Sequence, residues 1–232
     1  MKRAIKLILT FASGGLVVIL SLLWCAIFLT PPANSGFSRN YNLSPEEVAY
    51  LNGLRQKYSG TQRTLSAEEL KSVIARACAF ISSRKGLENT YDTPEVRELL
   101  FGTACVETGL RPRYQDSAGN AIGLFQIEYA TFCDIWKRAI KRNHPELGRE
   151  LIRHFAKCVP NDITFEDLQL SDELSAIFAR LKYAHIKEPI PSDLQKQALY
   201  YKKYYNTHLG RATPESYVRA YKKFAPKAKD KK

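Results

Sequence analysis

Residues 107–127 read ETGLRPRYQDSAGNAIGLFQI, and the interpretation of the whole chain depends on this stretch. Glu107 ends a helical run in which Val96, Leu100 and Thr103 precede it at intervals that place all four on one helix face. A carboxyl group at the rim of a core loses hydration, and this burial raises its pKa toward the range of a general acid. Most glutamates at helix ends are instead solvated. Glu107 is therefore a candidate catalytic acid that needs support from its neighbours.

A Gly-Leu-Phe-Gln run follows Glu107 after a polar loop. Gly123 permits a close approach of the backbone to the acid, and Gln126 carries an amide able to donate to and accept from sugar hydroxyls or an acetamido group. Leu124 and Phe125 can supply the apolar walls of a binding site. Such a run on its own is more often a buried turn. Paired with Glu107, it becomes a candidate substrate-binding segment.

Together the two segments resemble the soluble lytic transglycosylase branch of the lysozyme superfamily, whose signature is a catalytic Glu followed by Ser and, after a loop, by Gly-Leu-Met-Gln. Thr108 stands at the position of the usual Ser, and Phe125 stands at that of the Met. Both replacements keep the hydroxyl or the apolar bulk, and the interval from Glu107 to Gln126 suits the family. The resemblance implies an all-α, lysozyme-like fold, a catalytic Glu107, and substrate contacts from Thr108 and from the run Gly123 to Gln126.

A third segment near the C-terminus, Tyr205-Asn206 followed by Gly210, is similar to the family's Tyr-Asn-Ala-Gly run. The match is looser, because three residues separate Asn206 from Gly210. In the family this Tyr lies against the catalytic Glu, so the resemblance implies that Tyr205 contacts Glu107 and that Asn206 lies beside it. The alternative is that the tyrosines of this region form an aromatic stripe in the core or line a groove.

The resemblance also implies a reaction that needs one carboxyl group, whereas glycosidases normally need two. Glu107 would protonate the oxygen of the β-1,4 bond between N-acetylmuramic acid and N-acetylglucosamine in the glycan strands of peptidoglycan, and would then deprotonate the C6 hydroxyl to close a 1,6-anhydro ring. No metal and no organic cofactor are implied. Asp116 and Glu128 are the nearby acids that a hydrolase, such as a lysozyme or a phage endolysin, would use as a second carboxylate. A non-catalytic murein-binding module is a further alternative.

The N-terminal segment predicts a membrane anchor. Lys2, Arg3 and Lys6 precede an uncharged apolar run at residues 7–29, which is long enough for a bilayer-spanning helix of ~20 residues. Basic residues before the run place the N-terminus in the cytoplasm and the remainder of the chain outside. A cleaved signal peptide is the alternative. The expected location is the inner membrane, crossed once, with the catalytic domain in the periplasm.

Four parts are predicted along the chain: the anchor at 1–30, a linker at 31–43, a lysozyme-like domain at 44–224 and a basic tail at 225–232. Residues 137–160 look like a helical insert, which is the main departure from the family. Capping signals at Ser44, Ser66, Thr93 and Thr213, a stop signal at Gly109, and apolar periodicity together predict the helices. They are expected near 45–58, 67–84, 94–108, 129–143, 147–157, 165–169, 172–186, 192–206 and 214–223.

The net charge of +12 favours polyanionic partners, including nucleic acid, anionic lipid and the polymers of bacterial envelopes. The exported topology and the absence of a recognition-helix motif argue against nucleic acid. Outside the predicted anchor, Cys78, Cys105, Cys133 and Cys158 either form two disulfides, with three possible pairings, or remain buried thiols. Roles in wall remodelling, in a secretion system and in phage lysis are all compatible with these features.

Overall fold

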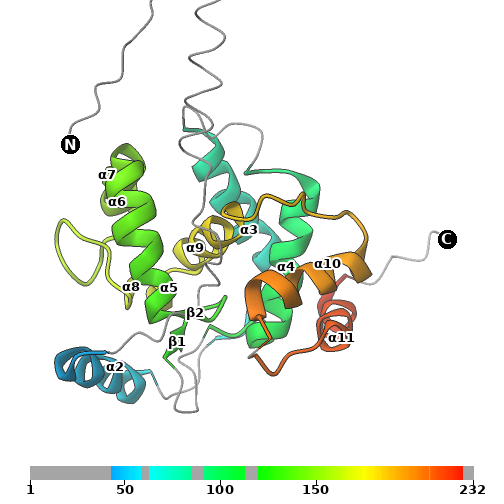
Figure 1. Ribbon diagram of the computed structural model, residues 1–232, viewed down its shortest axis with the longest axis horizontal. Coiled ribbons are helices and arrows are strands. Elements are labelled where there is room, and N and C mark those ends of the chain that lie inside the picture. The colour runs from blue at the N-terminus through cyan, green and yellow to red at the C-terminus, as the bar shows by residue number, and fades with distance from the viewer. Residues whose placement is uncertain (1–42, 59–62, 85–90, 113–119, 209, 227–232) are drawn as a thin grey trace, which may run out of the picture. The chain divides into compact units, whose positions relative to one another are not determined.

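The computed structural model describes residues 43–58, 63–84, 91–112, 120–208 and 210–226 (Figure 1). The predicted anchor at residues 7–29, nearly all of the predicted linker, most of the predicted tail and Asp116 lie outside the described residues. Within the described ranges, no helix combines the length and the apolar character that a membrane span requires.

The described chain is mostly helical, as predicted. Its α-helices are α2 (Pro45–Lys57), α3 (Ala67–Ser82), α4 (Pro94–Thr108), α5 (Tyr129–Cys133), α6 (Lys141–Asn143), α7 (Pro145–Phe155), α8 (Asp167–Leu170), α9 (Asp172–Ala184), α10 (Leu194–Tyr201) and α11 (Pro214–Phe224). Two π-helical segments are η1 (Asp134–Ile140) and η2 (Lys202–Asn206), and a two-stranded sheet contains β1 (Ala121–Ile122) and β2 (Ile127–Glu128).

Helix boundaries follow the capping signals in the sequence. At five helix starts, a side-chain hydroxyl accepts a hydrogen bond from the backbone N–H three residues later, which satisfies a donor that the helix leaves unpaired. Four of these caps are Ser44, Ser66, Thr93 and Thr213, and the fifth is Ser171 at the start of α9. Gly109 ends α4 in the left-handed conformation, with φ of 59°. The first four starts and this stop were predicted.

Two predicted helices are interrupted, and one hairpin was not predicted. The helix expected near 129–143 is divided into α5, η1 and α6, and the helix expected near 192–206 ends as η2. Strands β1 and β2 pair antiparallel, with Ala121 opposite Glu128 and Ile122 opposite Ile127. A two-residue strand is too short to show the alternation by which strands are recognised in a sequence. The hairpin encloses the Gly-Leu-Phe-Gln run, so it sets the shape of the candidate site.

Helix α9 is the centre of the described domain. Every residue from Leu174 to Tyr183 is buried. The helix packs against α3, α4, β2, η1 and η2, and Figure 1 shows it between α4 on one side and α6 and α7 on the other. A helix that is buried on all faces must place any polar residue it carries inside the protein. Lys182 of α9 is such a residue.

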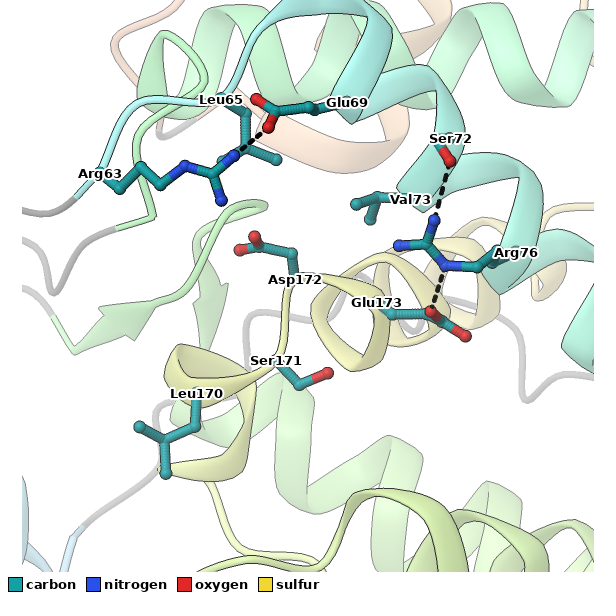
Figure 2. Close-up of a pocket in the computed structure, with 10 residues that line it drawn as sticks. All are labelled: Arg63, Leu65, Glu69, Ser72, Val73, Arg76, Leu170, Ser171, Asp172 and Glu173. Atoms are coloured by element: carbon teal, nitrogen blue, oxygen red, sulfur yellow. Dashed lines mark hydrogen bonds and ion pairs between the residues drawn. The ribbon is translucent and has the colours of Figure 1, made fainter.

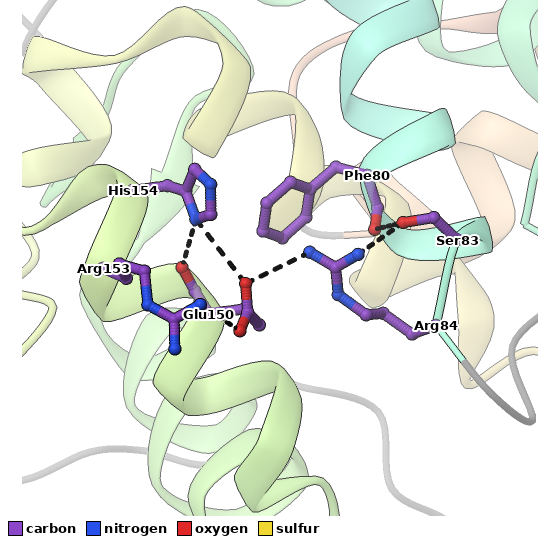
Figure 3. Close-up of polar contacts among 6 residues, drawn as sticks. All are labelled: Phe80, Ser83, Arg84, Glu150, Arg153 and His154. Atoms are coloured by element: carbon purple, nitrogen blue, oxygen red, sulfur yellow. Dashed lines mark hydrogen bonds and ion pairs between the residues drawn. The ribbon is translucent and has the colours of Figure 1, made fainter.

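The predicted insert at 137–160 packs on the end of α3 (Figure 3). Glu150 of α7 forms an ion pair with Arg84 at 3.6 Å, and the Phe80 ring meets the rings of His154 and Phe155 edge-on, with centroids 5.4 and 5.5 Å apart. The Arg84 and Glu150 side chains are each 27% exposed, and ion pairs near the surface contribute ~1 kcal/mol or less, whereas each aromatic pair adds about 0.5–1.5 kcal/mol beyond its buried area. The two aromatic contacts therefore contribute at least as much to this attachment as the ion pair.

The four cysteines of the described domain are free thiols. Cys78, Cys105 and Cys133 are buried, and burial raises the pKa values of Cys78 and Cys105 to about 12. These thiols act as small apolar side chains of the core. Of the two possibilities that the sequence left open, the structure supports free thiols over disulfides, and Cys158 is half-buried rather than buried.

Candidate active site

Glu107 lies in the last turn of α4, where the helix emerges from the core. It is half-buried, and it follows a run from Leu99 to Cys105 in which every residue is buried. The hydroxyl of Tyr201, which is fully buried, donates a hydrogen bond to Glu107 Oε1 at 2.8 Å. Burial first, and the nearby charge of Glu107 second, raise the pKa of Tyr201 above its usual value. The phenol therefore stays protonated and acts as a permanent donor to the carboxyl group.

The tyrosine that donates to Glu107 is one turn away from the one that the family resemblance indicated. Tyr205 is buried, and its hydroxyl donates to the Phe125 carbonyl oxygen at 2.7 Å. A phenol has one proton, so the donor to Glu107 is Tyr201 and not Tyr205. Residues four apart share a helix face, and the two rings stack with centroids 6.0 Å apart. Tyr201 belongs to the predicted aromatic stripe, and its spacing from Tyr205 was the available signal.

Gly123 packs tightly against α8 and α9. Its φ is +78°, and a Cβ there would lie 2.5 Å from the Leu168 carbonyl oxygen and 2.9 Å from Ser175 Oγ. Its N–H donates to Gln169 Oε1 at 3.1 Å. Glycine is required here because α8 and α9 press on the turn. Sequence reasoning missed Gln169 and Ser175, since their contacts are with residues distant in the chain.

The rest of the Gly-Leu-Phe-Gln run forms a buried turn. Leu124 and Phe125 are fully buried, so they pack in the core and do not form exposed walls of a binding site. Gln126 has a φ of +48°, is 9% exposed, and donates from Nε2 to the Gly123 carbonyl oxygen at 3.0 Å. The predicted sugar-binding amide therefore stabilises its own turn in this structure. The run therefore supports the site as a buried turn, and its side chains do not line the site.

Thr108 connects the end of α4 to this turn. Its hydroxyl lies 2.9 Å from the Leu124 carbonyl oxygen and 3.1 Å from that of Ala104, so its one proton is shared between these two acceptors. The bond to Leu124 joins the residue after Glu107 to the Gly-Leu-Phe-Gln turn. A Ser, the usual family residue, would form the same bond. The structure thus gives Thr108 a positioning function.

Asn206 lies at the end of η2, beside the Tyr201 hydroxyl. Its Oδ1 accepts a hydrogen bond from Lys202 Nζ at 3.0 Å, and Lys202 also donates to the Gly210 carbonyl oxygen at 2.8 Å. A Cβ on Gly210 would lie 2.3 Å from Asn206 Oδ1, so Gly210 lies directly against this side chain. Tyr205 and Asn206, both predicted from the third segment, are therefore brought near Glu107 with Tyr201.

Lys182 is a buried residue near the candidate acid that sequence reasoning missed. Its side chain is 8% exposed, and Nζ donates to the Tyr205 carbonyl oxygen at 3.0 Å. Burial lowers the pKa of Lys182, while the charges of Glu107 and Glu128 oppose that shift. Glu128 is exposed; it occupies the N-cap position of α5, but its side chain makes no capping bond. The Glu128 carboxylate therefore faces solvent.

Removal of the Tyr201 hydroxyl tests its contact with Glu107. Tyr201→Phe is expected to reduce the rate of any reaction catalysed by Glu107 by roughly 10- to 100-fold, because hydrogen bonds to charged groups contribute ~1.5–3 kcal/mol. The initial rate of that reaction at a fixed substrate concentration would measure the loss. Tyr204→Phe, on the same helical segment, is the matched control and should retain the parent rate. Equal rates for Tyr201→Phe and the parent would remove Tyr201 from the site.

A polar cavity of about 400 Å³ lies elsewhere, between the starts of α3 and α9 (Figure 2). The Arg76–Glu173 ion pair, with Nε to Oε2 at 2.8 Å, crosses one wall, and the Asp172 carboxylate points toward Arg63. Burial raises the pKa of Asp172, and Arg63 opposes that shift. None of the predicted site residues lines this cavity, so it is separate from the site around Glu107.

In the described ranges, no group of three or more His, Cys, Asp or Glu side chains is placed to hold a metal ion.

The site around Glu107 consists of a half-buried carboxyl group, a phenol that donates to it, and a rigid glycine turn connected to the same helix end. Comparisons of the chain with protein-family models, with curated proteins and with solved structures find no match in any of the three.

Proposed function

We propose that this protein is a membrane-anchored peptidoglycan lytic transglycosylase with a lysozyme-like domain, in which Glu107 is both the general acid and the general base. The observation that carries the proposal is the environment of Glu107. Its carboxyl group is half-buried, its orientation is fixed by the Tyr201 hydroxyl at 2.8 Å, and Thr108 ties its helix end to the Gly-Leu-Phe-Gln turn. An acid that donates and then recovers a proton needs this kind of fixed geometry.

In the proposed reaction, protonated Glu107 donates its proton to the glycosidic oxygen as the bond from that oxygen to C1 of the muramic acid breaks. The resulting Glu107 carboxylate then takes the proton of the C6 hydroxyl, whose oxygen forms the new bond to C1. The substrate supplies the nucleophile, so no second carboxylate and no water molecule are needed. The products are a 1,6-anhydro end and a free N-acetylglucosamine hydroxyl, and Glu107 is again protonated. Tyr201 orients the carboxyl group in both steps.

The proposal places the anchor at residues 7–29 in the inner membrane and the domain in the periplasm, where its substrate lies. The net charge of +12 suits a polymer that carries carboxylate groups on its peptide stems.

Mass spectrometry of the products from purified murein tests the proposal directly. The full-length chain is expected to release muropeptides with 1,6-anhydro ends, which differ by one water from the reducing-end products of a hydrolase. Reducing-end products would contradict the lyase and favour a lysozyme-type enzyme. Murein that is bound but not cleaved would contradict both and favour a non-catalytic binding module.

One observation favours a hydrolase as the second candidate. Glu128 is exposed, and both Glu128 and Glu107 act electrostatically on Lys182 and Tyr205. The two carboxyl groups therefore lie near the same two buried residues, Lys182 and Tyr205. A hydrolase could use Glu128 to activate water.

Replacement of Glu128 separates the two reactions. Glu128→Gln is expected to retain at least about half of the parent rate, because the lyase uses one carboxyl group and the Glu128 side chain makes no capping bond. Product release from murein, followed by chromatography, would measure this rate. A loss of ~100-fold or more, the usual contribution of a general base, would favour the hydrolase instead.

A further inference from the structure

Lys182 places an amino group inside the protein, without a direct ionic partner among the residues that the structure describes. Its side chain is 8% exposed, on a helix that is buried from Leu174 to Tyr183. In the part of the chain that the structure describes, its contacts are the Tyr205 carbonyl oxygen at 3.0 Å and the Tyr205 ring, whose centroid lies 3.8 Å from Nζ. A buried ammonium group without an ion pair is costly, and an apolar residue of similar size would serve the core better.

The contacts of Lys182 lead directly to the candidate acid. Lys182 holds Tyr205 by its backbone and by its ring, and the Tyr205 ring stacks on that of Tyr201. Tyr201 in turn donates to Glu107. Tyr205 also holds the Phe125 carbonyl oxygen, which belongs to the Gly-Leu-Phe-Gln turn. Through Tyr205, the ammonium group thus supports the stacked tyrosine rings and the Gly-Leu-Phe-Gln turn.

The charges that act on Lys182 come from two elements. Glu107 lies on α4 and Glu128 at the end of β2, and both favour the protonated lysine. The interaction is mutual, so the ammonium group favours the ionised form of Glu107. Glu107 becomes ionised when it gives its proton to the glycosidic oxygen, and a positive charge nearby makes that transfer easier.

We infer that Lys182 is a positioning residue of this site. It fixes the stacked rings of Tyr205 and Tyr201, and it stabilises the Glu107 carboxylate that forms when the acid donates its proton. The inference rests on the proposed function for its catalytic meaning. Its electrostatic part concerns Glu107 alone and is measurable whether or not the protein cleaves murein.

Two substitutions separate the charge from the hydrogen bond. Lys182→Gln removes the positive charge but keeps an N–H donor for the Tyr205 carbonyl oxygen, and Lys182→Arg keeps both. Lys203→Met is the matched control, because Lys203 is an exposed lysine on η2. If Lys182→Gln does not fold, as judged by circular dichroism, Lys182→Met takes its place, since methionine matches the length and apolar character of the lysine stem.

The experiment is a pH titration of the full-length chain labelled with ¹³C in the glutamate side-chain carboxyl groups. The Glu107 resonance is identified as the one that is missing from Glu107→Gln. In Lys182→Gln, the midpoint of the Glu107 titration is expected to rise by roughly one pH unit, because an opposite charge that favoured ionisation has been removed. In Lys182→Arg and Lys203→Met it should stay within about 0.3 pH unit of the parent.

Kinetics on murein give the second readout. The high-pH limb of the rate profile of Lys182→Gln should move upward with the Glu107 midpoint, because Glu107 stays protonated to higher pH, and the plateau rate should fall on the order of 10-fold as the acid becomes weaker. An unchanged Glu107 midpoint in folded Lys182→Gln, or an equal shift in Lys203→Met, would overturn the inference. A parent protein that releases no anhydro product, while the midpoint still shifts, would overturn the proposed function alone.

Discussion

Glu107→Gln is expected to lower the rate of glycan cleavage by about 10²- to 10⁴-fold, the usual contribution of a positioned acid or base. The amide has nearly the size of the carboxyl group, but it can neither donate a proton to the glycosidic oxygen nor take one from the C6 hydroxyl. Its oxygen still accepts the hydrogen bond that Tyr201 makes to Glu107 at 2.8 Å. The variant should therefore fold and bind murein like the parent.

The measurement is the initial rate of anhydro-muropeptide release, together with circular dichroism and a murein-binding assay. Glu95→Gln, in the first turn of the same helix, is the matched control and is expected to keep the parent rate. A Glu107→Gln protein that releases anhydro products at the parent rate would exclude Glu107 as the acid. Loss of binding together with loss of cleavage would instead indicate damage to the site as a whole.

Gly123→Ala is expected to destabilise the domain by roughly 2–4 kcal/mol, which combines the strain of a positive φ with the overpacking of a core. The added Cβ would lie 2.5 Å from the Leu168 carbonyl oxygen, a backbone atom that cannot move without shifting α8. For a domain of this size, such a change lowers Tm by about 5–15 °C. Cleavage should fall as well, because the turn accepts hydrogen bonds from Thr108 and Tyr205.

Gly53→Ala is the matched control for this prediction. Gly53 lies within α2, and a Cβ there would have no atom within 4 Å. Alanine should stabilise that helix by about 0.5–1 kcal/mol, because it costs less conformational entropy than glycine. Thermal unfolding followed by circular dichroism compares the two variants. A Gly123→Ala protein with a Tm within ~2 °C of the parent would contradict the contact with Leu168. This result does not depend on the proposed activity.

The helices were predicted well wherever their ends depend on near neighbours. Ser44, Ser66, Thr93 and Thr213 each cap a backbone N–H three residues away, and Gly109 adopts the positive φ that stops α4. Such bonds form within one turn of chain, so the local sequence contains everything that decides them. The interruptions by η1 and η2 were not predicted, because a π-helical turn depends on the surroundings of the helix and not on a local signal.

The candidate site was predicted only in part. The sequence placed Glu107 at the end of a helix and Thr108 beside it, and the structure gives that hydroxyl a bond to Leu124. Three other features were not predicted: Gly123 faces α8 and α9, Leu124 and Phe125 are buried, and the donor to Glu107 is Tyr201. Each of these features comes from a contact between residues far apart in the chain.

The sequence by itself determined the mostly helical fold, the four capped helix starts, the end of α4 and the choice of the candidate acid, because capping, apolar periodicity and motif spacing act over a few residues. Only the tertiary structure decided which tyrosine meets Glu107, why Gly123 must be glycine, and that Lys182 lies buried beneath Tyr205. Those outcomes depend on how α9 and α10 pack against α4 and the β1–β2 turn. No local pattern records such packing, since it is set by the burial of many side chains at once.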